Sequence, residues 1–262
     1  MRTIHRVLDT DGHDETRGCR YALALMTKAP RAGQVKTRLV PPLKNEEAAQ
    51  LNKCFLRDTA AAISACCRSL AVSKRQPASA CGIAVYTPVG AESDYADILP
   101  ADFSLLAQRG DAFGDRLYFA AKDLFKCGFE GVCLIDSDSP TIPAGNFVLA
   151  VEHLSSPNER IVLGPCDDGG YYLIGSRTLH REVFEGIDWS TERVLEQTKW
   201  RASQIGLEVC ELPCGFDVDD RATLHRLCDE LLGDGARDSA APETKEFLRA
   251  LVASEGRGRF WS

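Results

Sequence analysis

The sequence predicts an α/β fold in which a mainly parallel β-sheet is covered by helices on both faces. Short apolar runs alternate with longer segments of helical periodicity along the 262 residues, a pattern typical of βαβ units. Apolar runs such as residues 21–27 and 131–136 suit strands that are buried on both sides. No internal repeat of about 20–50 residues occurs, which argues against a solenoid.

The N-terminal half of this pattern begins with a strand at residues 21–27, followed by a loop rich in Pro, Gly and basic residues. A helix follows this loop, with Asn45 as its N-cap and Glu46 and Glu47 in its first turn. Further strands are expected at residues 80–88, 103–108 and 131–136, and a second helix at residues 111–126.

The C-terminal half continues the alternation. We expect strands at residues 160–165, 170–175 and 207–213. The predicted helices cover residues 143–154, 190–206 with Ser190 as N-cap, 218–232 and 243–252.

This pattern predicts one domain with two appendages. Residues 1–19 are polar and unpatterned and are expected to form a loose extension. Residues 20–232 carry all the strands and form the domain, whereas residues 233–262 combine a Gly/Ala/Ser/Pro linker with a short C-terminal helix.

Composition excludes several functional classes. The net charge of −7 argues against a nucleic-acid-binding protein, although a local basic loop could still bind one nucleotide. No window reaches the roughly 20 apolar residues of a membrane span, and the N-terminus lacks a signal sequence. The eleven scattered cysteines form no C-x-x-C pair, which favours reduced thiols and a cytoplasmic location.

A basic loop follows the first strand. It contains Lys28, Gly33, Lys36 and Arg38, residue types that bind phosphate oxygens. The loop is no Walker A motif, because Val35 stands where the glycine before the lysine belongs, and the chain has no G-x-G-x-x-G fingerprint. Taken alone, the loop could equally be a solvated surface loop.

Asp136 and Asp138 end the apolar strand at residues 131–136. Residues i and i+2 of an extended strand face the same way, so both carboxylates could approach one cation. Mg²⁺ or Mn²⁺ would suit such oxygen ligands, together with substrate phosphates. The alternative is an ordinary turn after a strand, with Pro140 ending it.

Two further acidic stretches also follow strands. Asp168 precedes Gly169 and Gly170, which allow a ligand to approach the backbone closely. Asp217 and Asp219 are candidate metal ligands, but Asp219 could instead be a helix N-cap, and Asp220 is more readily explained as one. We expect Trp189 and Trp200 to be packing residues. Tyr171 and Tyr172 are neighbours in a predicted strand, so their side chains should face opposite ways and only one of them can line a pocket.

Five motifs in order resemble a bacterial family of GT-A-fold transferases. They are "MTKAPRAGQVKTRL", "QRGDAFGDRL", "DSDSPTIP", "GPCDDGGYYLIG" and "FDVDD", and they span about residues 21–230. Members of this family are usually described as glycosyltransferases or nucleotide-diphospho-sugar transferases. They are similar to the molybdenum-cofactor and 2-phospholactate guanylyltransferases. The resemblance implies a three-layer αβα GT-A fold for residues 20–232.

The resemblance also implies roles for residues. It places Lys28, Lys36 and Arg38 near the nucleotide phosphates, and it makes Asp138 a metal ligand together with Asp217 or Asp219. A small residue commonly stands at the position of Asp136 in the family, which favours Asp138 as the principal ligand. Gly110, Asp111, Gly114 and Arg116 match a second motif that is expected to shape the nucleotide or acceptor pocket. Of the candidate residues, Gly33, Gly110, Asp111 and Arg116 are assigned to the nucleotide, and Asp168, Gly169, Gly170 and Tyr171 to the acceptor side.

Two chemistries fit such a site, and both would use a nucleotide or sugar nucleotide with a small-molecule acceptor. A glycosyltransferase would expel a nucleoside diphosphate, and an inverting enzyme would need a base, for which Asp168 is the candidate. A nucleotidyltransferase would let a substrate phosphate attack a nucleoside triphosphate and release pyrophosphate, with no protein base required. A non-catalytic nucleotide-binding module is the third possibility. The family description favours the glycosyltransferase.

Overall fold

The computed structural model describes residues 3–10, 18–73, 78–233, 235, 240–256 and 258–261. Its centre is an eight-stranded sheet in the order β1-β4-β3-β2-β5-β7-β6-β8. β7 is antiparallel to β5 and β6, and every other pairing is parallel. The strands are β1 Arg6–Val7, β2 Tyr21–Lys28, β3 Ala80–Thr87, β4 Ser104–Ala107, β5 Gly131–Ile135, β6 Arg160–Pro165, β7 Tyr171–Ser176 and β8 Glu208–Glu211.

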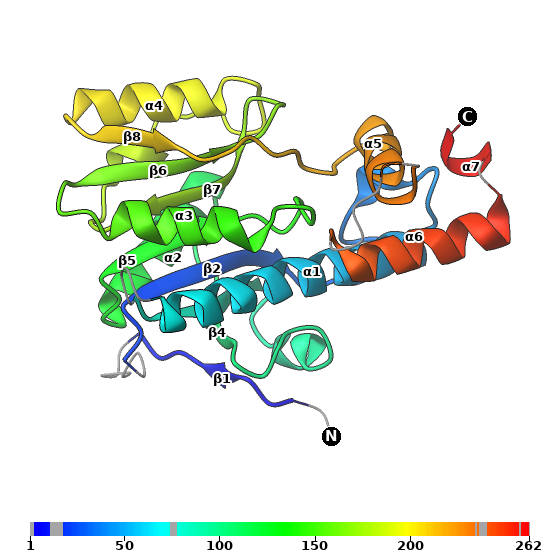
Figure 1. The fold of residues 1–262 in the computed structure, drawn as a ribbon, viewed down its shortest axis with the longest axis horizontal. Coiled ribbons are helices and arrows are strands. Elements are labelled where there is room, and N and C mark those ends of the chain that lie inside the picture. Colours follow the sequence, from blue (N-terminus) through cyan, green and yellow to red (C-terminus); the bar gives the residue numbers. More distant parts are fainter. Residues whose placement is uncertain are drawn as a thin grey trace.

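Helices cover both faces of the sheet (Figure 1). α1 (Asn45–Val72) and α3 (Ala144–Leu154) pack on one face, and α2 (Phe113–Lys126) and α4 (Val194–Gln204) on the other. The predicted three-layer αβα architecture with a mainly parallel sheet is therefore confirmed. The connections contain the 3₁₀ helices η1 (Thr37–Leu39), η2 (Glu92–Tyr95) and η3 (Glu182–Phe184).

The central strand β2 explains why its sequence is nearly continuously apolar. Leu23 and Leu25 belong to the core under α1 and α3, whereas Ala22 and Ala24 belong to the core under α2. All four side chains are fully buried. A strand covered on both faces cannot carry alternating polar residues, because neither face reaches water.

A third core lies beside the sheet, where α5 (Arg221–Leu232), α6 (Pro242–Glu255) and α7 (Gly258–Trp261) adjoin the N-terminal part of α1 (Figure 1). Leu51 and Phe55 of α1 share this core with Leu224 and Leu248. The C-terminal helix predicted at residues 243–252 is thus longer than expected. It packs on the domain rather than extending from it as an appendage.

Asp58 of α1 supports the docking of α6. Its buried carboxylate accepts hydrogen bonds from the backbone N–H groups of Glu243 (3.0 Å) and Thr244 (2.9 Å). These groups are in the first turn of α6, whose own N-cap residue, Ala241, offers no side-chain oxygen.

Removing this remote cap should destabilise the protein. We expect Asp58→Ala to lower the free energy of unfolding by about 1–3 kcal/mol, because two backbone donors lose their acceptor. Asp58→Asn keeps an acceptor oxygen and should cost less. Urea unfolding of the three proteins measures the difference, and equal stability of Asp58→Ala and the unaltered chain would contradict the capping role.

The N-terminal segment differs from the predicted loose extension. The two residues of β1 pair with β4, and the buried His5 ring lies 3.2 Å from the carbonyl oxygen of Phe103. Part of residues 1–19 therefore belongs to the edge of the sheet, while residues 11–17 lie outside the described residues. A strand of this length leaves no periodic signal in the sequence.

The strand order places a topological switch point between β2 and β5. From β2 the chain adds β3 and β4 on one side, and then returns to place β5 on the other. Loops that leave neighbouring strands here turn away from each other, which opens a crevice at the carboxyl ends. None of the helices in the described ranges is long and apolar enough to cross a membrane.

Candidate active site

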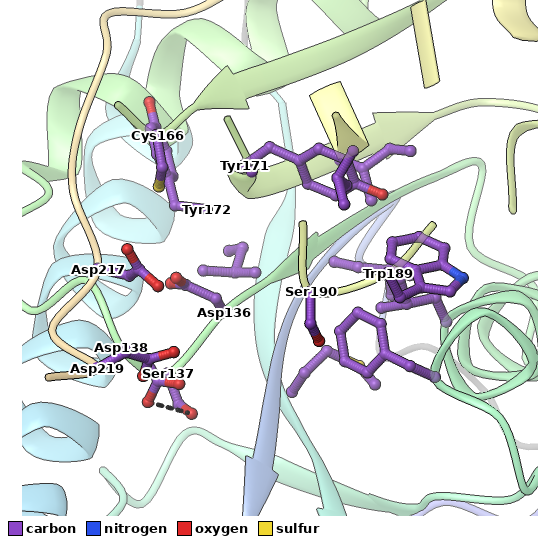
Figure 2. Close-up of a pocket in the computed structure, with 18 of the residues that line it drawn as sticks. Asp136, Ser137, Asp138, Cys166, Tyr171, Tyr172, Trp189, Ser190, Asp217 and Asp219 are labelled. Atoms are coloured by element: carbon purple, nitrogen blue, oxygen red, sulfur yellow. Dashed lines mark hydrogen bonds between the residues drawn. The ribbon is translucent and has the colours of Figure 1, made fainter. Parts of the chain in front are cut away.

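A cavity of about 600 Å³ opens at the carboxyl edge of the sheet, at the switch point (Figure 2). Its walls come from the ends of β2 to β6, the start of β7, and the loop before α4. A second cavity of about 350 Å³ lies over the basic loop. The two cavities share Lys28, Arg38, Ser137, Asp138, Ser190 and Asp219 along their boundary.

Lys28 and Arg38 are the exposed cations of this boundary. Neither has a carboxylate within 4.0 Å in the part of the chain that the structure describes. Gly33 lines neither cavity. Its positive φ of 72° is a backbone conformation that favours glycine, in the loop between Lys28 and Arg38.

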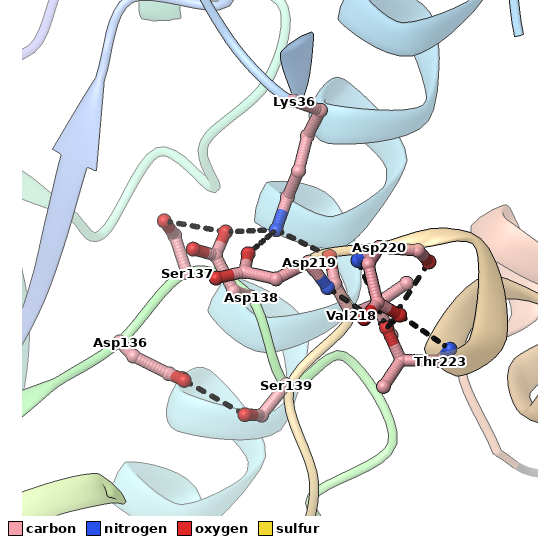
Figure 3. A network of polar contacts seen from close by, with 9 residues as sticks. All are labelled: Lys36, Asp136, Ser137, Asp138, Ser139, Val218, Asp219, Asp220 and Thr223. Atoms are coloured by element: carbon pink, nitrogen blue, oxygen red, sulfur yellow. Dashed lines mark hydrogen bonds and ion pairs between the residues drawn. The ribbon is translucent and has the colours of Figure 1, made fainter. Parts of the chain in front are cut away.

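Lys36 lies differently from the other two cations (Figure 3). Its ammonium group is 2.8 Å from Asp138 Oδ1, 3.0 Å from Asp219 Oδ1 and 2.7 Å from the carbonyl oxygen of Val218. Its side chain is only 4% exposed. An ammonium group has three N–H donors, and these acceptors use all of them. In this conformation Lys36 joins three loops, instead of presenting its charge to a ligand as the sequence suggested.

Burial alone would lower the pKa of Lys36, but the charges of Asp138 and Asp219 reverse this effect, and the pKa lies above its ordinary value. Lys36 is therefore a permanent cation between the two carboxylates. Its single positive charge offsets one of the two negative charges of Asp138 and Asp219, and both aspartates still line the two cavities.

Asp138 pairs with the ammonium group of Lys36, whereas Asp136 does not. The carboxylate of Asp136 turns toward the opposite side, where it accepts a hydrogen bond from Ser139 Oγ at 2.7 Å (Figure 3). Figure 2 shows Asp136 facing Asp217 across the cavity. The strand spacing that suggested a common direction fails because β5 ends at Ile135 and both aspartates lie in the turn beyond it.

A second group of acidic side chains has no cation between its members. Oxygen atoms of Asp168 and Asp217 and the sulfur of Cys166 lie within 4.8 Å of one another, and Asp136 adjoins them. Burial, followed by the charges of Asp168 and Asp219, raises the pKa of Asp217 to about 6. Burial and the charges of Asp138 and Asp217 likewise raise the pKa of Asp136 well above its ordinary value.

This donor set fits a divalent cation. Oxygen atoms of Asp168 and Asp217 lie within 4.8 Å of each other, and Asp136 faces Asp217. The repulsion between these carboxylates is what a bound cation would relieve. Burial, followed by the charges of Asp136 and Asp217, raises the pKa of the Cys166 thiol, which therefore stays protonated and contributes no thiolate. Mg²⁺ or Mn²⁺ suits these ligands better than a thiophilic metal.

Gly170 orients the carboxylate of Asp168, whereas Gly169 allows a close contact between two loops. The backbone N–H of Gly170 donates to Asp168 Oδ1 at 2.8 Å, which orients an exposed carboxylate at the cavity wall. Gly169 lies outside the cavity lining, with φ of 89°. A Cβ atom there would lie 2.1 Å from the carbonyl oxygen of Glu192, so glycine is needed for the close contact between these two loops.

The motif around residue 110 is likewise mostly structural. Gly110 has φ of 106°, and the Arg116 guanidinium donates to the carbonyl oxygens of Gly110 (3.3 Å) and Asp111 (3.0 Å). Only Arg116 of these three lines the cavity. Asp220 caps α5 by accepting from Thr223 N at 2.9 Å, as the sequence suggested.

The loop before α4 differs from the sequence prediction. α4 begins at Val194 instead of near a Ser190 cap, and Ser190 has a positive φ of 65° beside both cavities. Trp189 of this loop lines the larger cavity together with Phe113 and Tyr171. Phe113 and Trp189 were missed as site residues, because they come from segments about 75 residues apart. Tyr171 was expected on the acceptor side.

Comparisons with known proteins show which families and structures the chain resembles. Residues 71–191 match the DUF2064 family. Its members are described as uncharacterized proteins conserved in bacteria. A provisionally named nucleotide-diphospho-sugar transferase from Desulfovibrio desulfuricans G20 is 28% identical, with a TM-score of 0.75. This similarity covers 90% of the present chain and 96% of the other. No curated protein matches the sequence.

Other solved structures are less similar to the chain. A cytidylyltransferase from Leptospira borgpetersenii is 10% identical over 92% of this chain and 97% of its own, with a TM-score of 0.47. Glucosyl-3-phosphoglycerate synthase from Mycobacterium tuberculosis, solved with Mn²⁺ and uridine diphosphate, is 10% identical over 88% and 86%, with a TM-score of 0.46. The predicted resemblance of the chain to nucleotide-diphospho-sugar transferases is confirmed, and so is the transferase class.

Proposed function

We propose that this protein is a metal-dependent transferase that uses a sugar nucleotide and transfers the sugar to a small-molecule acceptor. One observation carries the proposal: two exposed cations, Lys28 and Arg38, share a cavity with the carboxylates of Asp136, Asp168 and Asp217. Among the described residues, neither cation has a carboxylate within 4.0 Å and none of these three carboxylates has an ion pair. Nucleotide phosphates need the first group, and a divalent cation that bridges to those phosphates needs the second. The similarity to the transferase of D. desulfuricans supports this assignment.

The residues at the cavity have three roles in this proposal: they bind phosphate, bind the metal or hold carboxylates in place. Lys28 and Arg38 bind the diphosphate and stabilise the negative charge that develops on it as the leaving group departs. Asp136 and Asp217, with the remaining oxygen of Asp138, hold Mg²⁺ or Mn²⁺. When bound, the cation supplies Lewis-acid stabilisation of the same charge. Lys36 holds Asp138 and Asp219 in place and takes no direct part.

Asp168 is the candidate base for glycosyl transfer. Its carboxylate is exposed at the cavity wall and oriented by the N–H of Gly170. It would accept the proton of the acceptor hydroxyl as that oxygen attacks the sugar carbon, while the nucleoside diphosphate leaves from the opposite side.

Nucleotidyl transfer is the second candidate, and the position of Asp168 favours it. One oxygen of Asp168 lies within 4.8 Å of a ligand atom of Asp217. If Asp168 binds the cation too, no carboxylate is left as a base. A phosphate acceptor that attacks a nucleoside triphosphate needs none, because it is already ionised. A purely nucleotide-binding module does not explain the carboxylates in the cavity. Without a bound cation, acidic groups beside phosphates would weaken nucleotide binding.

The released product distinguishes these possibilities. The protein is incubated with sugar nucleotides, and separately with nucleoside triphosphates, in the presence of Mg²⁺ or Mn²⁺ and mixed sugar and sugar-phosphate acceptors. Nucleoside diphosphate as the product supports glycosyl transfer, and pyrophosphate supports nucleotidyl transfer. Metal-independent nucleotide binding without any turnover would contradict both and favour the binding module.

A further inference from the structure

We propose that Phe113 and Trp189 form the binding site for the nucleobase of the donor, an inference that rests on the proposed function. The two rings meet edge to face at one wall of the larger cavity, with their centroids 5.0 Å apart and their planes at 72°. Tyr171 lies behind Trp189, with centroids 6.5 Å apart. This cluster, called the aromatic wall below, is one of the apolar surfaces of the cavity.

The exposure of Phe113 indicates that it contacts a ligand. Its side chain is 51% exposed, although it is large and apolar, and it lines the cavity at the first position of α2. A ligand that enters the cavity would remove part of this exposed surface from water. A flat aromatic ring gains both apolar burial and stacking on such a surface.

Trp189 is fixed in place by a glycine. A Cβ atom on Gly114 would lie 2.7 Å from Nε1 of Trp189 and 2.7 Å from the carbonyl oxygen of Phe184. The indole thus packs directly on the backbone of the first turn of α2. A ring that is held before the ligand arrives loses little conformational entropy on binding, as a specificity pocket requires.

A polar group that can read the edge of a base lies in the same cavity. Gln108 follows β4, and its Nε2 atom donates to the carbonyl oxygens of Thr27 (3.1 Å) and Val85 (2.7 Å). These two bonds fix the orientation of the amide. Its Oε1 atom accepts no hydrogen bond from the described residues and is available to an N–H group of a base.

The distribution of charge favours the nucleobase over the acceptor. Figure 2 shows the labelled aspartates on one side of the cavity and Trp189 on the other, with Ser190 between them. Ser190 also borders the smaller cavity over the basic loop. A nucleotide is the ligand that joins a flat ring to phosphates, and one that spans Lys28 and Trp189 leaves the wall around Asp168 open to the acceptor.

Tryptophan fluorescence tests the proposal directly. The chain has three tryptophans, so the double variant Trp200→Phe/Trp261→Phe leaves Trp189 as the single reporter. This variant is titrated with uridine, cytidine and guanosine diphosphates and with inorganic pyrophosphate, each with Mg²⁺. We expect saturable quenching by at least one nucleoside diphosphate and none by pyrophosphate, which has no ring to stack.

Phe113→Ala measures the contribution of the wall. Calorimetry should show a Kd for the preferred nucleoside diphosphate about 10-fold or more weaker than in the unaltered protein, and an unchanged Kd for pyrophosphate. Trp200→Phe is the matched control, because Trp200 is 54% exposed outside the cavity. Equal melting temperatures exclude a folding defect, and Phe113→Leu serves as the second variant if Phe113→Ala melts earlier.

The possible failures are distinguishable. Unchanged nucleotide affinity in Phe113→Ala would overturn this inference. If the acceptor KM rises in turnover assays at the same time, the aromatic wall binds the acceptor instead. Absence of binding by both nucleoside diphosphates and pyrophosphate would contradict the proposed function itself.

Discussion

Asp217→Asn is expected to lower metal-dependent turnover by at least about 100-fold. Asp217 faces Asp136 across the cavity, and one of its oxygens lies within 4.8 Å of an oxygen of Asp168. The amide has the same shape but carries no charge, so the cation loses one of its anionic ligands. Even loss of a group that merely orients a ligand typically costs 10–100-fold in metal affinity or activity, and loss of a direct ligand costs more.

Binding of Mn²⁺, followed by electron paramagnetic resonance, provides a readout that is independent of turnover. The Kd for Mn²⁺ should rise by a similar factor in Asp217→Asn. Asp167→Asn is the matched control. Asp167 lies in the same sheet-edge region, pairs with Arg226 and does not line the cavity. Unchanged Mn²⁺ affinity in Asp217→Asn would remove Asp217 from the metal site.

The same substitution should have the opposite effect on stability when no metal is added. At neutral pH the charge of Asp217 is opposed by burial and by Asp168 and Asp219. Asn removes this repulsion, so the metal-free variant is expected to melt at a higher temperature than the unaltered protein. Repulsion between carboxylates lowers the stability of the metal-free site, and a bound cation would relieve it. The carboxylates would thus reduce stability in return for metal binding.

Lys36→Met should cause the largest loss of stability. Removal of one partner of a buried ion pair costs about 3–5 kcal/mol, since the remaining charge is left uncompensated. Asp138 and Asp219 are 35% and 45% exposed and can regain water, so we expect a smaller loss of about 2–3 kcal/mol. Met retains most of the apolar stem, which isolates the effect of the ammonium group.

Lys28→Met is the control for Lys36→Met. Lys28 is exposed and belongs to the same loop, so its removal should change the free energy of unfolding by less than about 0.5 kcal/mol. It should instead weaken the binding of pyrophosphate. If urea unfolding shows equal losses for the two variants, Lys36 does not join the three loops as described.

Much of the fold follows from local sequence. The apolar runs at residues 21–27 and 131–136 predicted central strands because a strand covered on both faces tolerates few polar residues. The start of α5 was also readable, since Asp220 stands where an N-cap belongs and Thr223 completes the capping box. The short β1 strand was not predicted, because a pairing of two residues carries no periodicity and depends on the neighbouring β4.

The sequence predicted which charged residues gather at the candidate site, but not how they pair with one another. The ends of parallel strands meet at one edge of a sheet, so the basic loop and the acidic turns could be placed together from their order alone. The pairing among these charges could not. Lys36, Asp138 and Asp219 come from segments about 80–180 residues apart, and the approach of their atoms to about 3 Å depends on how the loops pack.

The sequence by itself thus determined the layered α/β architecture and the gathering of cations and carboxylates at the carboxyl edge. The tertiary structure decided which charges remain available to a ligand. It buries Lys36 between Asp138 and Asp219 and leaves Lys28, Arg38 and the Asp136–Asp217 pair facing the cavity. The reason is physical: strand and helix periodicity is a property of neighbouring residues, whereas charge compensation is a property of distances that only packing fixes.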